Sequence, residues 1–147
     1  MVIREFVEED RSALQHIYLL SRRESFTWLD LASSTLADFD RHTPGEKIWL
    51  CESQAEIVAF ISVDVTENYI HHLFVLPEHI GEGYGSALLT ECLKHIGRPA
   101  MLKCLARNTR ALKFYERSGW RTIAMGTDPL DRDYHLMECG HESGPRD

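Results

Sequence analysis

The 147-residue sequence lacks the marks of several large classes of protein. No apolar stretch reaches the roughly 20 residues that a membrane helix needs, so we expect no membrane partner. Positive charge is scarce: the sequence has 16 Lys and Arg against 23 Asp and Glu, which gives a net charge of −7. This acidic balance argues against a nucleic-acid partner. The first residues, Met1–Phe6, show neither the basic nor the long apolar stretch of a secretory signal, which predicts a cytoplasmic protein.

Paired cysteines are also missing. Cys51, Cys92, Cys104 and Cys139 are far apart, form no C-x-x-C motif and mostly lie in apolar runs. We therefore expect buried, reduced thiols rather than disulfides or a zinc site, and no bound metal. A packed thiol without basic neighbours is a poor nucleophile, so covalent catalysis by Cys92 or Cys104 is not expected.

The sequence does contain a conspicuous glycine-rich segment. Val75–Ser86 reads V-L-P-E-H-I-G-E-G-Y-G-S, with a strand-like run before it and a helical pattern after it. Gly81, Gly83 and Gly85 allow tight backbone turns, and the following helix begins with free N–H groups at the positive end of its dipole. The segment fits neither the dinucleotide fingerprint G-x-G-x-x-G nor a nucleotide P-loop. We expect an anionic group to bind there.

The hydrophobic pattern predicts one domain over residues 1–140, followed by a polar tail over residues 141–147. Strands are predicted at Val2–Val7, Lys47–Ser53, Glu56–Val65, Tyr69–Leu76, Ala100–Ala106, Trp120–Met125 and Asp133–Cys139. Helices are predicted after the acidic run 8–10, within Ser25–Asp40, from the glycine segment to a stop at Gly97, and after an N-cap at Asn108. The strands between residues 47 and 76 are expected to form an antiparallel meander.

Two segments together carry a resemblance to a known family. Leu73–Leu89 reads L-F-V-L-P-E-H-I-G-E-G-Y-G-S-A-L-L and Asn108–Trp120 reads N-T-R-A-L-K-F-Y-E-R-S-G-W. With their separation and strand order, they resemble the GNAT superfamily of acyl-CoA-dependent N-acyltransferases. The resemblance covers nearly the whole chain, apart from residues 26–44 and the tail.

The resemblance implies an α/β (α+β) fold with a single mixed, mostly antiparallel sheet of about seven strands, splayed at the coenzyme site and flanked by about four helices. It also implies acetyl-CoA as cosubstrate. Ile80 departs from the family, which usually has Gln or Arg at this position, so we expect weaker coenzyme binding. The implied coenzyme contacts are Leu73, Phe74, Val75, Ile80, Gly81, Glu82, Gly83, Tyr84, Gly85, Ser86, Asn108 and Tyr115.

Tyr115 is implied to be the general acid that protonates the departing thiolate. A phenol with a pKa of about 10 can supply a proton to a thiolate with a pKa of about 8.5. From periodicity alone, Tyr115 is better read as a core aromatic residue, and it is the match of the motif at Asn108, Ala111, Phe114 and Gly119 that favours the general acid.

The general base is expected on the strand that leads to the splay. His71 is interpreted as a base or water relay, because imidazole titrates near neutrality, and a structural or solvated histidine is the alternative. Tyr69, on the same face, is a second candidate. Since neighbouring residues of a strand point to opposite faces, His71 and His72 are not expected to face one site.

The acceptor cleft is implied to have one wall in the variable segment that holds Phe26, Trp28 and Asp30. Core packing of the two aromatic residues is the alternative. The acidic turn 128–133 is read as a solvated turn in preference to a second, cation-attracting wall.

The sequence therefore predicts an N-acetyltransferase that passes an acetyl group from acetyl-CoA directly, in a ternary complex, to a primary amine of a small molecule, peptide or protein. The alternative is a catalytically weak acyl-CoA-binding regulatory module, prompted by Ile80 and by the absence of a firmly assigned base. The amine, the preferred acyl length and homodimer formation are left open by the sequence.

Overall fold

The computed structural model describes residues 1–25 and 34–140. The elements are β1 (Val2–Glu5), α1 (Arg11–Ser25), α2 (Asp38–His42), β2 (Lys47–Ser53), β3 (Glu56–Asp64), β4 (Tyr69–Val75), α3 (Tyr84–Cys92), β5 (Ala100–Leu105), α4 (Thr109–Arg117), β6 (Arg121–Thr127) and β7 (Asp133–Cys139). Short 3-10 turns lie at Glu8–Asp10 and Pro77–His79. This order agrees with the element sequence expected from the pattern, except that α2 begins only at Asp38 and runs to His42, beyond the predicted Ser25–Asp40 stretch, of which residues 26–33 lie outside the described ranges.

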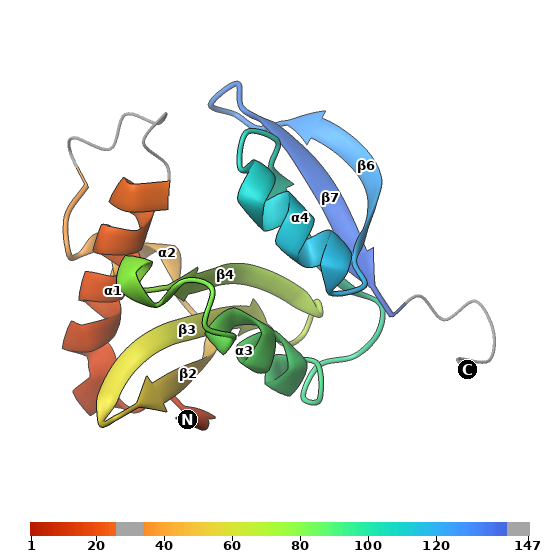
Figure 1. The fold of residues 1–147 in the computed structure, drawn as a ribbon. Coiled ribbons are helices and arrows are strands. Elements are labelled where there is room, and N and C mark those ends of the chain that lie inside the picture. The colour runs from red at the N-terminus through yellow and green to blue at the C-terminus, as the bar shows by residue number, and fades with distance from the viewer. Residues whose placement is uncertain (26–33, 141–147) are drawn as a thin grey trace.

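The strands form one seven-stranded mixed sheet in the order β1-β2-β3-β4-β5-β7-β6. All neighbours are antiparallel except β4 and β5, which run parallel because α3 connects them as a crossover. In Figure 1, α1, β2, β3 and β4 form one group at the lower left, and α4, β6 and β7 form another at the upper right. The arrangement confirms the predicted fold class.

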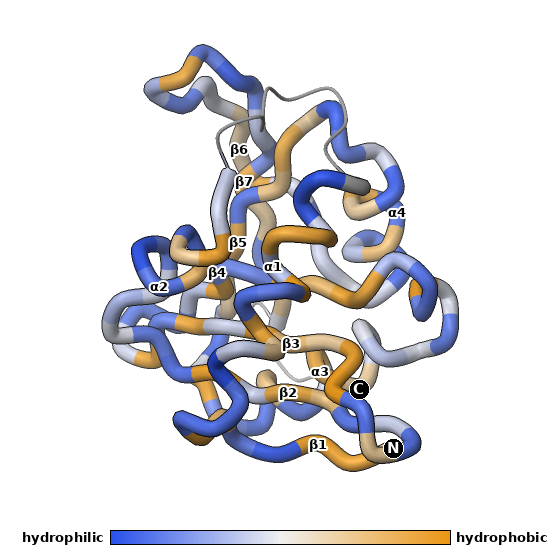
Figure 2. Tube along the Cα trace, turned by 90° about the vertical axis from the view of Figure 1, so that its left-hand side faces the viewer, coloured by the Kyte–Doolittle hydropathy of each residue, from blue (hydrophilic) through white to orange (hydrophobic). Residues whose placement is uncertain are grey.

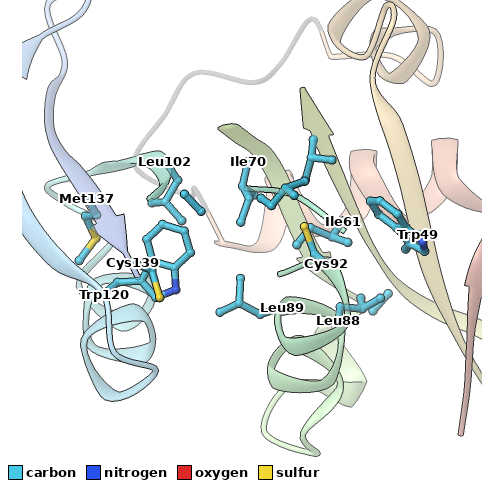
Figure 3. Packing of buried hydrophobic residues seen from close by; sticks show 14 of the residues in the cluster. Trp49, Ile61, Ile70, Leu88, Leu89, Cys92, Leu102, Trp120, Met137 and Cys139 are labelled. Carbon is cyan, nitrogen blue, oxygen red and sulfur yellow. The ribbon is translucent and has the colours of Figure 1, made fainter. Parts of the chain in front are cut away.

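Both faces of the sheet are covered, so the inner strands alternate between two apolar clusters. Leu50 and Phe60 pack with Leu14 and Ile17 of α1 and with Phe39 of α2. The other face packs against α3 and α4. Figure 3 shows Ile61 and Ile70 of one strand group, Leu102 and Met137 of the other, and Leu89 of α3 between them. Apolar stretches accordingly mark much of the strands in Figure 2, while connecting segments are mostly hydrophilic.

The helix after the glycine segment is shorter than its apolar stripe predicts. Leu88, Leu89 and Cys92 are buried as expected, and Ile96 is buried too, but α3 ends at Cys92. Beyond it, Lys94 N bonds to Glu91 O and His95 N to Cys92 O, which are tighter i to i+3 contacts. A stripe of buried residues therefore continues through a turn that is no longer α-helical.

The four cysteines are buried, as expected, and none of them forms a disulfide within residues 1–25 and 34–140. Burial raises the pKa of Cys92 to about 12 and that of Cys104 to about 11. Within the described ranges, no helix combines the length and apolarity needed to cross a bilayer.

The N-terminal strand is fixed by a charged network. Arg4 donates to both carboxylate oxygens of Asp10, at 2.8 and 2.9 Å, and to Glu52 at 2.6 Å. The Asp10 side chain is 7% exposed and also accepts a hydrogen bond from the backbone N–H of Val7 at 2.8 Å. The hydrogen bonds from Arg4 hold the pKa of Asp10 below its usual value against the effect of burial.

Candidate functional site

The central feature of the site is the place where the two groups of strands separate. The parallel pairing of β4 with β5 consists of Tyr69 opposite Met101 and Ile70 opposite Leu102. From there on, β4 stays paired with β3 as far as Val75, while β5 is paired with β7 as far as Leu105. The sheet therefore opens along residues 73–75 of β4, as the family resemblance implied.

A cavity of about 680 Å³ fills this opening. Its walls come from β4, the glycine segment, and residues 107–117, which include one face of α4 along its whole length, so both sequence motifs meet in one place. The lining residues are Leu73, Phe74, Val75, His79, Ile80, Gly81, Gly83, Tyr84, Gly85, Ser86, Arg107, Asn108, Thr109, Arg110, Ala111, Phe114, Tyr115 and Arg117. A volume of this size is typical of a small-molecule or cofactor site.

The glycine segment has the backbone geometry that its composition predicts. Gly81 and Gly83 have φ angles of +89° and +92°, which residues with a Cβ adopt only with strain. Gly83 is the N-cap of α3, so the N–H groups of the first turn face outward beside the cavity. Gly85, which was expected to allow a turn, instead lies inside α3 with an ordinary φ. A Cβ there would lie 3.4 Å from the Phe114 ring, which is ordinary van der Waals contact.

Four basic side chains surround this part of the cavity, and the sequence reasoning missed all of them. Arg107, Arg110 and Arg117 line it from the α4 side, and His79 lines it from the glycine segment. His79 Nδ1 donates to Glu82 Oε1 at 3.0 Å, and this bond raises the pKa of His79. The chain is acidic overall, yet its cavity carries the positive charge that an anionic ligand requires.

Two residues of the second motif, Asn108 and Tyr115, are placed on α4 beside the opening. Asn108 is the N-cap, and its side chain accepts a hydrogen bond from Ala111 N at 3.3 Å, which confirms the predicted cap. The Tyr115 ring packs edge-on against Phe114 and Trp120, with centroids 5.2 and 5.9 Å away. Burial raises the pKa of the Tyr115 phenol, so it stays protonated well beyond neutral pH.

Of the twelve implied coenzyme contacts, Glu82 is the one that does not line the cavity. Its carboxylate is instead engaged with His79. A carboxylate that lined an anion site would repel the ligand, so the position of the Glu82 carboxylate outside the cavity favours anion binding. Phe26, Trp28 and Asp30, the implied wall of the acceptor cleft, lie outside the described residues.

The two histidines of β4 face the same side, contrary to the alternation expected from the sequence. The register with β3 shifts between Ser62, opposite His72, and Val63, opposite Ile70, so His71 is the extra residue of a β-bulge. A bulge interrupts strict alternation and re-aims side chains. Both rings therefore contact the 42–46 segment: His72 Nε2 lies 3.1 Å from His42 O, and His71 Nδ1 lies 3.7 Å from Glu46 Oε2.

His72 sits in an aromatic environment at the α1 side of the opening. Its ring lies 5.3 Å from Tyr18 and stacks on Phe74 at 6.2 Å. Because a carbonyl oxygen only accepts, Nε2 carries the hydrogen and donates it to His42 O. Burial lowers the pKa of His72 to about 4, so the ring is neutral near pH 7.

His71 and Tyr69 lie close together, with ring centroids 4.8 Å apart. Neither belongs to the 680 Å³ cavity, and His71 instead lines a second cavity next to α2. Burial raises the pKa of Tyr69 to about 12. The structure thus places the proposed base three residues along β4 from Phe74, at about 10 Å for an extended strand.

Comparison with known proteins agrees with this geometry. The model of the acetyltransferase (GNAT) family matches residues 11–120, which is well over half of the chain. The protein therefore belongs to the GNAT acetyltransferase family, as the two motifs indicated. A search of curated proteins gives no significant match.

Solved structures share the fold at low sequence identity. The apo form of YjaB from Escherichia coli is 21% identical, with a TM-score of 0.77 over 94% of this chain and 97% of that one. PaiA N-acetyltransferase from Thermoplasma acidophilum, solved in complex with coenzyme A, is 16% identical, with a TM-score of 0.77 over 95% and 98%. A ribosomal-protein-alanine N-acetyltransferase from Brucella melitensis is 18% identical, with a TM-score of 0.68 over 94% and 98%.

Proposed function

We propose that this protein transfers an acetyl group from acetyl-CoA to a primary amine, directly and within a ternary complex. The observation that carries the proposal is the single cavity in which the splayed β4, the glycine segment and Tyr115 come together. Membership of the GNAT family supports the reaction class. The solved complex of PaiA with coenzyme A supports the choice of cosubstrate.

The coenzyme would bind through its diphosphate and its pantetheine arm. The N–H groups of the 81–86 segment and the dipole of α3 suit a diphosphate, and Arg110 and Arg117 add positive charge. The edge of β4 that opens away from β5 suits the extended amide-bearing arm as an added strand. This backbone recognition does not depend on the side chain of residue 80, so Ile80 is compatible with binding.

The chemistry requires one bond to form and one to break. The amine nitrogen attacks the thioester carbonyl, the C–S bond breaks, and the thiolate takes the phenolic proton of Tyr115, while the amine loses a proton to a base. A thiolate formed in this buried site is destabilised by burial, as the raised pKa values of Cys92 and Cys104 illustrate for thiols of this protein. The high pKa of Tyr115 therefore does not prevent the proton transfer.

His71 is the proposed base, acting through water, because about 10 Å of strand separates it from the opening. Tyr69, its ring neighbour, is the second candidate for the same step. Imidazole is suited to accept the proton of an ammonium near neutral pH.

The test combines calorimetry with acetyl-CoA and thiol release on a panel of alkylamines, lysine derivatives and peptides with free N-termini. Binding together with thiol release on at least one amine is the expected result. Tight binding without thiol release on any acceptor would favour the alternative, a weak regulatory coenzyme-binding module. Absence of binding would remove both functions.

A further inference from the structure

The ring of His79 joins the glycine segment to the hairpin between β2 and β3. Its Nδ1 lies 3.0 Å from Glu82 Oε1, and its Nε2 lies 3.6 Å from Oε1 of Glu56, the first residue of β3. The same two segments are joined a second time, because the Tyr84 hydroxyl donates to Ser53 Oγ at 2.9 Å. The glycine segment is therefore anchored through one histidine and one tyrosine, and of these two only the histidine changes charge near neutral pH.

The surroundings of His79 suit the doubly protonated imidazolium. A carboxylate oxygen only accepts a hydrogen, and a neutral imidazole has a single N–H, so the neutral ring can serve only one of its two carboxylate neighbours. The hydrogen bond with Glu82 raises the pKa of His79, and the charges of Glu56 and Glu78 act in the same direction. The Tyr84 ring lies edge-on to the imidazole at 5.9 Å. Three carboxylates thus surround one histidine.

The proton on His79 sets the charge of one side of the coenzyme cavity. The guanidinium groups that line the cavity from the other motif keep their charge throughout the physiological pH range; they belong to Arg107, Arg110 and Arg117. On the glycine segment, protonated His79 gives the Glu82 carboxylate a charged partner outside the cavity. Neutral His79 offsets none of the three carboxylates beside it. The proposed reaction uses Tyr115 and His71 and gives His79 no step.

We propose that coenzyme binding is coupled to protonation of His79, whose imidazolium adds positive charge beside the diphosphate and keeps the Glu82 carboxylate away from it. The proposal rests on the proposed function, because it takes the diphosphate of acetyl-CoA as the anion in this cavity. By linkage, affinity is highest below the pKa of His79 in the free protein. It falls as pH rises through that value and levels off above the pKa of His79 in the complex.

Calorimetric titration with acetyl-CoA from about pH 6 to about pH 9 tests the coupling. The Kd of the wild type should rise about tenfold over this range, which corresponds to a His79 pKa about one unit higher in the complex than in the free protein. Titrations in buffers of different ionisation enthalpy should show that protons are taken up on binding. The 3′-phosphate of the coenzyme titrates near pH 6, but it is common to all variants and cancels when proteins are compared at one pH.

Three variants separate the charge of His79 from a structural effect. At about pH 6, His79→Gln should bind acetyl-CoA about tenfold more weakly than the wild type, and its Kd should not rise with pH. The double variant His79→Gln with Glu82→Gln should recover most of the lost affinity, because the repelling carboxylate is gone. His79→Arg should bind with similar affinity at both ends of the pH range, because a guanidinium does not titrate there.

The matched control is His95→Gln. His95 Nε2 also lies 3.0 Å from a carboxylate oxygen, Glu91 Oε2, but His95 does not line the cavity, so this variant should keep the wild-type pH profile. Three results would each overturn the proposal: a wild-type Kd that does not rise with pH, a His79→Gln profile that matches the wild type, or a double variant that binds as weakly as His79→Gln.

Thiol release on the amine panel separates this inference from the proposed function. A Kd that depends on the proton of His79, without acetylation of any amine, would keep the coupling and reject the transferase. Acetylation of an amine, with a Kd that is unchanged in His79→Gln, would keep the transferase and reject the coupling. Absence of acetyl-CoA binding would reject both.

Discussion

Replacement of Tyr115 by phenylalanine tests the step on which acetyl transfer depends. The change removes the hydroxyl and keeps the ring that packs between Phe114 and Trp120. General acid catalysis contributes about 10²- to 10⁴-fold, and a water molecule can partly replace the phenol, so we expect kcat to fall about 100-fold. This corresponds to about 2.7 kcal/mol of transition-state stabilisation. Affinity for acetyl-CoA should change less than about twofold, because its expected contacts are backbone amides and cations.

Release of coenzyme A thiol, followed with a chromogenic thiol reagent, measures kcat directly. The four protein thiols are buried, so their background reaction should be slow. Tyr134→Phe is the matched control: its ring lies outside the cavity, against Lys103 Nζ at 4.7 Å, and kcat should be retained. If Tyr115→Phe kept kcat within about threefold of the wild type, the proton-donor role would be refuted.

Three other predictions follow from the backbone and the charges. Gly83→Ala should lower the free energy of unfolding by about 1–2 kcal/mol, because the φ angle of Gly83 is +92°. Gly85→Ala should leave the stability unchanged or raise it, because Gly85 has an ordinary φ inside α3. Equal losses of stability for the two variants in chemical denaturation would contradict this reasoning. Arg110→Gln should weaken acetyl-CoA binding about fivefold at low salt and less at high salt, as measured by calorimetry, and a salt-independent loss would argue against a charge contact. Asp10→Asn should destabilise the fold by about 2 kcal/mol at pH 7. The hydrogen bonds from Arg4 lower the pKa of Asp10 in the folded state. The stability difference between wild type and variant should therefore be fully present above the carboxyl pKa of the unfolded chain, and it should disappear as pH falls through the pKa of the folded state. A stability difference that does not change with pH in urea denaturation would refute the ion-pair account.

The elements could be predicted from the sequence because local signals mark their ends. Asn108 caps α4, glycine residues precede α3, and the strands of the meander are separated by short polar turns. Strand bounds accordingly agree within one or two residues. The end of α3 was misplaced because buried side chains at Leu89, Cys92 and Ile96 satisfy a helical pattern even where the backbone has tightened.

The face of the sheet to which the side chains of His71 and His72 point could not be predicted from such local signals. The bulge at His71 arises from the register between β3 and β4, and no residue type in β4 alone specifies it. The partner of His72 is His42, 30 residues earlier in the chain, and the partner of His71 is Glu46, 25 residues earlier. Such contacts depend on tertiary structure.

The basic residues of the cavity did leave a signal. Arg110 and Arg117 are seven positions apart, which is about two turns of a helix, so they lie on one face of α4. Arg107 stands just before the N-cap. Overall acidity hid this local excess of positive charge, because net charge averages over the whole surface.

The narrow junction between β4 and β5 has a consequence for how the empty protein melts. Two register pairs join a four-stranded block to a three-stranded block, and the remaining cohesion comes from the apolar side chains around α3. A pantetheine arm bound along β4 would contact both blocks and hold them together. Saturating coenzyme A should then raise the melting temperature and sharpen the calorimetric transition, because coenzyme A binds only when the two blocks are folded together, so that they unfold as one unit.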